Sequence, residues 1–140
     1  MNMHQRMLDV MLDFEAQIDT LFKQLIHSRW DISRRQLWEP PVDVIEKEDE
    51  VEIIVDLPGV DIETFDISLE KNNVIIAGNR PEHTTERSRK FLSERNNGPC
   101  GRVIRLDPYE AYGEVITNYR NGVLHVTVKR QATHRAPDEH

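Results

Sequence analysis

The side chains best suited to chemistry in this sequence are six histidines and a single cysteine. The histidines are dispersed, and the sequence contains no nucleophile elbow, no glycine-rich phosphate loop and no HExxH motif. His134 and His140 stand close to Asp138 and Glu139, but a polar tail expected to be frayed is not pre-organised to hold a metal ion. We therefore predict that the protein is not an enzyme and needs no metal and no other cofactor.

Composition narrows the range of partners and compartments. A net charge of −7 over 140 residues disfavours general binding to nucleic acid or to anionic membranes. No apolar run approaches the roughly 20 residues that a membrane span needs, and the N-terminus lacks the pattern of a signal peptide. Cys100, either a redox-sensitive thiol or an incidental one, cannot form an internal disulfide, so we expect a reducing compartment, the cytoplasm.

The most legible structural element is a β-hairpin centred on Asn121-Gly122. These two residues tolerate positive φ, as a tight type I′ turn requires. Apolar and polar residues alternate on both sides of the turn, and the shared face carries Val115, Thr117, Tyr119, Leu124, Val126 and Val128. Because an isolated hairpin is only marginally stable, other strands must cover this face.

Further segments predict the remaining strands. The period of two covers residues 42–45, 51–56 and 65–69, while a more fully apolar run predicts a strand at 74–77 and short strands are expected at 91–95 and 102–106. Pro58-Gly59 has the residue order of a type II turn, and we expect other turns at 71–73, 96–99 and 107–108. Short strands at this spacing, with no long helix between them, indicate an all-β fold, an immunoglobulin-like antiparallel β-sandwich.

The start of the chain has a helical period instead. An a/d heptad stripe is formed by Met7, Met11, Phe14, Ile18, Leu21 and Leu25, and Phe22 widens it. A helix this short needs its stripe covered, either by its own domain or by other subunits and client proteins; the flexible methionines favour the second. We divide the chain into a helical N-terminal arm, 1–38, a β-sandwich domain, 39–130, and a short polar C-terminal tail, 131–140.

The charges are segregated along the chain. Residues 39–70 are rich in acids that only Lys47 opposes, whereas residues 80–105 carry an excess of arginines. Either the two runs are solvated strand edges, or they form complementary surfaces that guide the docking of subunits.

Five segments of residues 38–130 together resemble the α-crystallin domain of the small heat-shock proteins. They are WEPPVDV at 38–44, VDLPGV at 55–60, VIIAG at 74–78, Arg105-Leu106 ahead of a proline, and NGVL at 121–124. Each is a weak motif alone, but all five in this order and spacing are specific. The sequence departs from the family where Thr117 replaces the usual alanine, where Arg130 replaces a frequent proline, and in a tail without an Ile-x-Ile-like triplet.

The resemblance implies an ATP-independent molecular chaperone, a holdase that binds partly unfolded proteins and prevents their aggregation under stress. Two alternatives from other classes stay open. One is a CS-domain-like co-chaperone adaptor, which would bind a folded ATP-dependent chaperone. The other is a structural self-assembling protein without client binding.

The resemblance also implies where subunits and clients bind. The arm stripe is the expected client-binding and assembly surface. Bacterial and plant family members exchange a strand of the long loop, here expected from Phe91 to Arg95, with Arg105 supporting the dimer contact. An edge groove between residues 65–69 and 113–119 is a second candidate site, with Ile67, Leu69, Val115 and Thr117 in it. In the family the Ile-x-Ile triplet docks in a neighbour's groove. Without this triplet we expect a homodimer, and we expect the arm to hold together any higher homo-oligomer.

Overall fold

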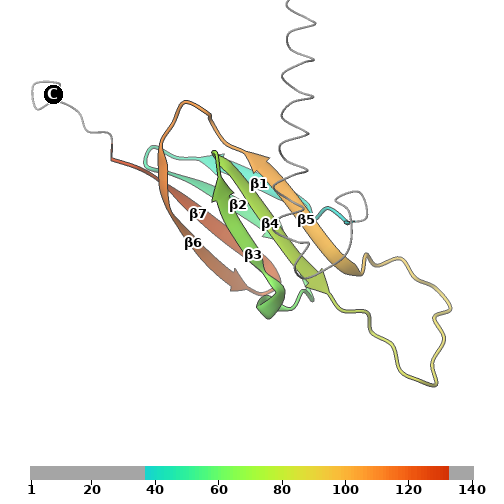
Figure 1. Cartoon of the computed structure of the whole chain (residues 1–140). Coiled ribbons are helices and arrows are strands. Elements are labelled where there is room, and N and C mark those ends of the chain that lie inside the picture. The colour runs from blue at the N-terminus through green and yellow to red at the C-terminus, as the bar shows by residue number, and fades with distance from the viewer. Residues whose placement is uncertain (1–36, 133–140) are drawn as a thin grey trace, which may run out of the picture.

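The computed structural model describes residues 37–132 of the chain (Figure 1). The elements in this range are β1 (Val42–Glu46), β2 (Glu50–Asp56), the 3-10 helix η2 (Ile62–Thr64), β3 (Asp66–Glu70), β4 (Asn73–Arg80), β5 (Gly98–Arg105), β6 (Tyr112–Arg120) and β7 (Val123–Arg130). The prediction of an all-β fold is confirmed for this part of the chain.

The strands form two antiparallel sheets that pack as layers (Figure 1). One sheet has the order β1-β2-β7-β6 and the other the order β3-β4-β5. β1 and β6 are therefore the edge strands of the first sheet, and β3 and β5 are those of the second. The prediction of an antiparallel β-sandwich is confirmed, and each strand has an apolar face because side chains alternate along it.

The centre of the core lies where β2 pairs with β7. Ile53 faces Val126 across this pair, and neither side chain is exposed to solvent. Val51 and Val55 of β2, with Val128 and Leu124 opposite them, extend the same buried stripe. β4 covers it from the other sheet with Val74 and Ile76. Burying each of these side chains contributes roughly 1.5–3 kcal/mol, so this stripe is a main source of the stability of the domain.

Two tight turns meet at one end of the sandwich. Asn121 and Gly122 have φ values of 55° and 77°, which confirms the hairpin predicted between β6 and β7. Gly59 has a φ of 76°, and the amide of Val60 donates to the carbonyl of Leu57 at 3.3 Å, which confirms the Pro58-Gly59 turn. The amide of Leu57 donates to the carbonyl of Gly122 at 2.8 Å, so the two turns brace each other.

The strand predicted at residues 91–95 is wrong for the single subunit. Within the described range, residues 81–97 form a loop without a strand, and Figure 1 shows this loop extending away from both sheets. A strand needs a neighbour for its backbone hydrogen bonds, and a loop in this position has none in its own subunit. β5 also begins earlier than predicted, at Gly98, because β4 continues to Arg80 and pairs with it there. The turn expected at 96–99 gives way to this pairing.

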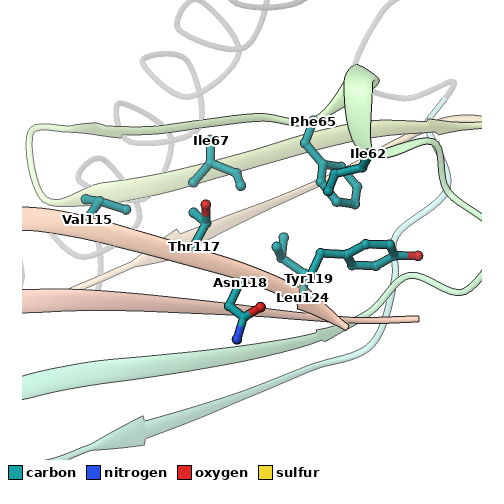
Figure 2. A pocket seen from close by; sticks show the side chains of 8 residues that line it. All are labelled: Ile62, Phe65, Ile67, Val115, Thr117, Asn118, Tyr119 and Leu124. Carbon is teal, nitrogen blue, oxygen red and sulfur yellow. The ribbon is translucent and has the colours of Figure 1, made fainter. Parts of the chain in front are cut away.

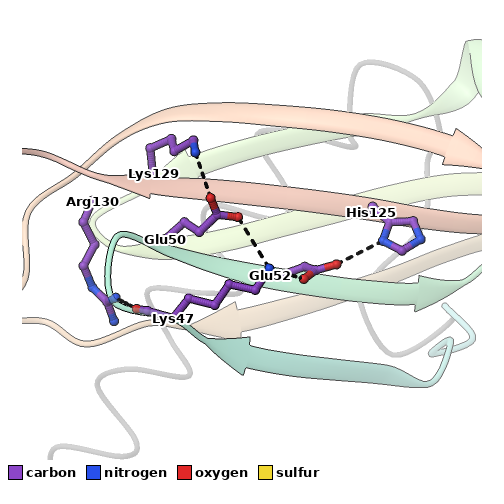
Figure 3. A network of polar contacts seen from close by, with 6 residues as sticks. All are labelled: Lys47, Glu50, Glu52, His125, Lys129 and Arg130. Atoms are coloured by element: carbon purple, nitrogen blue, oxygen red, sulfur yellow. Dashed lines mark hydrogen bonds and ion pairs between the residues drawn. The ribbon is translucent and has the colours of Figure 1, made fainter.

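A network of charges lies on the outer face of the sheet that contains β2 and β7 (Figure 3). Lys129 Nζ lies 2.8 Å from Glu50 Oε1, and Lys47 Nζ lies 2.9 Å from Glu52 Oε2. His125 Nδ1 lies 3.3 Å from the other oxygen of Glu52. The hydrogen bond from Lys47, and then that with His125, lowers the pKa of the Glu52 carboxyl. Part of the acidic run is therefore paired within the subunit.

We expect Glu52→Gln to destabilise the domain slightly at neutral pH and not at all in acid. Because its pKa is lower when folded, the carboxylate stabilises the folded state above its ordinary pKa of 4.5, and this contribution is lost as the pH falls through the lowered value. The difference in melting temperature between wild type and variant should therefore shrink toward zero as the pH falls below 4.5 and passes the lowered pKa. Glu86→Gln, on the exposed loop, is the control, and equal pH profiles for the two variants would contradict the assignment.

Candidate binding groove and subunit contacts

An open groove of about 670 Å³ lies between β3 and β6, where the edges of the two sheets face each other (Figure 2). Its lining consists of Ile62, Phe65, Ile67, Val115, Thr117, Asn118, Tyr119 and Leu124. No charged side chain is among these eight described residues. The groove therefore offers an uncharged surface, on which apolar side chains stand beside polar groups, that another chain can reach while the domain stays folded.

Aromatic packing fixes one end of the groove. The rings of Phe65 and Tyr119 meet edge to face, with centroids 5.0 Å apart and planes at 84°. The Tyr119 hydroxyl donates to the carbonyl of Leu57 at 2.6 Å, which anchors the ring to the turn that precedes η2. Ile62, in η2, is 59% exposed beside them. This end is therefore a rigid wall with an accessible apolar rim.

The structure brings most of the residues predicted for the groove together. Ile67 of β3 points toward Val115 and Thr117 of β6 (Figure 2). Leu69, predicted beside them, packs against the core and does not line the groove. Thr117 is exposed, so its hydroxyl lies at the groove rather than in the core.

Sequence reasoning missed the other lining residues, Ile62, Phe65, Asn118, Tyr119 and Leu124. Phe65 and Tyr119 stand two positions from Ile67 and Thr117 on the same faces, so the alternation in the sequence could have found them. Ile62 had no such signal, because η2 is a single short turn outside any periodic segment.

The residues predicted for the dimer contact do not form one patch within the subunit. Phe91 is 96% exposed and Leu92 71% exposed on the loop of residues 81–97. Arg95 lies on the same loop, with its guanidinium beside Gly59. Arg105 is exposed at the last position of β5, whereas the loop joins β5 at its first position. One subunit therefore presents two exposed apolar side chains on the loop that leads into one end of β5 and an arginine at the other end.

We expect Arg105→Ala to leave the stability of the isolated domain nearly unchanged, by roughly 0–1 kcal/mol, because solvent screens an exposed arginine. If Arg105 instead supports the contact between subunits, the variant should dissociate at higher concentration than wild type while its melting temperature at high dilution stays the same. Analytical ultracentrifugation across a concentration series, with Arg120→Ala on β6 as the control, measures this. Identical dissociation curves would remove Arg105 from the dimer contact.

Cys100 lies inside β5 and is only 1% exposed. Burial raises the pKa of its thiol to about 11, partly offset by the charge of Arg80 and by a hydrogen bond with the backbone of Gly78. Because the thiolate is the reactive form, this burial favours an incidental thiol over a redox-sensitive one.

The seven residues predicted for the arm surface lie outside the described part of the chain: Met7, Met11, Phe14, Ile18, Leu21, Phe22 and Leu25. Between residues 37 and 132, no three or more histidine, cysteine or acidic side chains gather where they could hold a metal ion. Nor does that part of the chain contain a helix with the length and hydropathy of a membrane span.

The chain is similar to known proteins over most of its length. Residues 43–140 match the sequence model of the "Hsp20/alpha crystallin family". Small heat shock protein C4 of Rickettsia felis is 26% identical over 128 residues, which are 87% of this chain and 78% of the relative. A probable 15 kDa heat shock protein of Leptospira interrogans is 28% identical, over 70% of this chain and 75% of its own.

Two solved structures share the architecture described above. HspA from Xanthomonas axonopodis superposes with a TM-score of 0.60 at 28% identity, over 67% of this chain and 95% of that one. Heat shock protein 16.0 from Schizosaccharomyces pombe superposes with a TM-score of 0.59 at 26% identity, over 73% of this chain and 96% of its own.

Proposed function

The chain belongs to the Hsp20/alpha crystallin family of small heat-shock proteins, which are chaperones and not enzymes, and from this premise we propose that it is an ATP-independent holdase. It binds partly unfolded client proteins and prevents their aggregation under stress. Capture of this kind needs no bond to be made or broken; it needs apolar surface on a scaffold that stays folded while clients unfold.

The groove between β3 and β6 is the observation that carries this proposal. Its lining is uncharged, and Ile62, Phe65 and Ile67 present apolar surface along one side of it. An aliphatic or aromatic side chain from a client that becomes buried there contributes about 1.5–3 kcal/mol, so a segment with several such side chains binds usefully. Partly unfolded proteins share exposed apolar segments. The groove binds such segments for their apolar surface and does not require a particular amino-acid sequence.

The domain around the groove supplies a scaffold for capture. The stripe shared by β2 and β7 is fully buried, and among its described members only Leu124 also lines the groove. Occupying the groove therefore does not require the core to open. We place the activity in the cytoplasm, where a single buried thiol such as Cys100 suits a reducing environment.

Subunit contacts complete the proposal. The two exposed apolar side chains of the loop, Phe91 and Leu92, are suited to a homodimer contact, because most of their surface is left uncovered within the described part of the subunit. The arm stripe, from Met7 to Leu25, joins dimers into a higher homo-oligomer and supplies the larger client-binding surface, with the groove as the second.

The test is the heat aggregation of an unrelated, heat-labile protein, followed by light scattering without nucleotide. We expect the intact protein to suppress scattering at an equimolar ratio. Thr117→Arg places a charge in the groove, and Ile116→Arg places the same charge on the opposite face of the same strand, where Ile116 is 43% exposed. We expect protection to fall in the first variant only.

The other outcomes separate the alternatives. Scattering that stays unchanged with excess protein, while the oligomer persists, would overturn the holdase assignment and favour a structural self-assembling protein. Equal protection by both arginine variants would move client binding from the groove to the arm. Stable binding of a purified ATP-dependent chaperone, without protection of the client, would favour an adaptor.

A further inference from the structure

Trp38 is the residue through which the N-terminal arm joins the β domain. Its amide donates to the carbonyl of Pro99 at 3.4 Å, and its own carbonyl accepts from the amide of Gly101 at 3.1 Å. Its indole Nε1 donates to the carbonyl of Gly98 at 3.0 Å. Three hydrogen bonds thus fasten this one residue to the start of β5, directly beside Cys100.

Arg80 holds the Trp38 ring from the other side. Its guanidinium carbon lies 4.3 Å from the centroid of the indole, and the side chain is only 8% exposed in total. Its Nε donates to the carbonyl of Pro58 at 2.8 Å, and its Nη1 donates to the carbonyl of Asn96 at 2.7 Å. A cation stacked on an aromatic face is attracted to it, and more strongly when water is excluded.

These contacts converge on the base of the loop of residues 81–97. Arg80 is the last residue of β4, where the loop begins, and Asn96 lies near the point where the loop ends. Gly98, which accepts from the indole of Trp38, is the first residue of β5. One stacked pair therefore joins the attachment point of the arm to both ends of the loop.

The pair has two chemically reasonable states. In the closed state the indole covers the guanidinium of Arg80, and the carbonyls of Pro58 and Asn96 accept hydrogen bonds from its Nε and Nη1. In an open state the guanidinium is hydrated, which suits a permanently charged group, and Trp38 leaves together with the arm. Two buried aliphatic side chains would not gain a comparable hydration free energy if they separated. The junction of Trp38 and Arg80 is therefore suited to a local opening.

We propose that the stack of Trp38 on Arg80 is a latch that couples the N-terminal arm to the loop of residues 81–97. While the latch is closed, arm and loop leave the domain from one fixed point. Opening it releases the attachment of the arm and loosens both ends of the loop together. The latch is argued from the contacts described above. Its consequence, that the dimer contact and the client-binding arm are released together, rests on the proposed function.

Cys100 makes the state of the latch measurable. It is the single cysteine of the chain, it pairs with Trp38, and Trp38 packs on the core cluster that contains it. When Trp38 leaves, Cys100 loses its backbone bridge and the core cluster that holds the thiol loses the packing of Trp38, so the thiol should react faster with a thiol reagent.

The experiment uses the full chain and the reagent DTNB under native conditions. Arg80→Met keeps the length of the side chain and removes its charge and hydrogen bonds, and Arg120→Met on β6 is the matched control. We expect Arg80→Met to raise the labelling rate of Cys100 at least tenfold and Arg120→Met to leave it within a factor of two. Hydrogen–deuterium exchange should rise in residues 37–41 and 95–99 together, while β2 and β7 stay protected.

Two results would overturn the latch. One is faster exchange in residues 95–99 of Arg80→Met without faster labelling of Cys100, because arm and loop would then move independently. The other concerns wild type, and it applies even if Arg80→Met fails to fold. Labelling of wild-type Cys100 should depend only weakly on urea below the unfolding transition; labelling that follows the full urea dependence of global unfolding would show that no local opening occurs. Neither result depends on client protection.

Discussion

A protein that lacks residues 1–36 should keep a folded β domain, lose most of its protection of a heat-labile client and fall in mass to a dimer. The arm carries the longest apolar stripe of the sequence, whereas the core is built from strands within the described range. The cut must leave Trp38 in place, because its hydrogen bonds to Pro99 and Gly101 belong to the domain. Light scattering of the client, circular dichroism and native mass measure the three effects.

Deleting residues 133–140 is the matched control, and we expect it to change the native mass very little. From 131 to 140 the only apolar residues are Ala132, Ala136 and Pro137. Burying an isoleucine contributes about 1.5–3 kcal/mol, and a tail without one forfeits most of such a contact. A large oligomer that collapses on loss of this tail would contradict the prediction, as would full protection by the protein that lacks the arm.

Gly122→Ala should lower the melting temperature by roughly 10 °C or more, the largest stability effect that we expect from a single methyl group. Gly122 has a φ of 77°, which costs another residue about 1–2 kcal/mol. An added Cβ would also stand 3.0 Å from Cα of Pro58, a backbone atom that cannot move without disturbing the paired turn. Overpacking of this kind costs about 1–3 kcal/mol more. Thermal unfolding followed by circular dichroism measures the sum.

Gly98→Ala separates the two causes. Gly98 has a φ of 86°, but nothing lies within 4 Å of the place where its Cβ would be. This variant should therefore lose only the backbone contribution, about 1–2 kcal/mol. If Gly98→Ala and Gly122→Ala melt at the same temperature, the contact between the two turns does not contribute to the stability of the domain.

The elements that the sequence predicts well are those whose signal is local. The hairpin at Asn121-Gly122 needs only two residues that accept positive φ between alternating strands, and its register followed from the turn. The strand expected at residues 91–95 failed because a strand is defined by its neighbour, and the residues of a single segment do not reveal whether one is present. β5 began earlier than expected for the same reason, since its pairing with β4 outweighed the turn signal of Gly98-Pro99.

The candidate sites divide in the same way. Ile67 and Thr117 were expected to lie opposite each other because each occupies a known face of a predicted strand. The stack of Trp38 on Arg80 joins residues far apart in the sequence through contacts with backbone carbonyls, and backbone acceptors have no signature in a sequence. Arg80 therefore counted only as one charge in a basic run, although it is one of the most buried polar residues described.

The position of β1 at the edge of its sheet affects how the domain can pair with extended segments of other proteins. An exposed edge offers unpaired backbone groups to any extended chain, and Val44 and Ile45 are 44% and 42% exposed there. Yet Pro41 precedes the strand, and Asp43 and Glu46 place negative charge along it. Proline and charge are the devices by which edge strands resist templated growth. In the holdase role proposed above, these residues would hinder an aggregating client from adding a strand to β1.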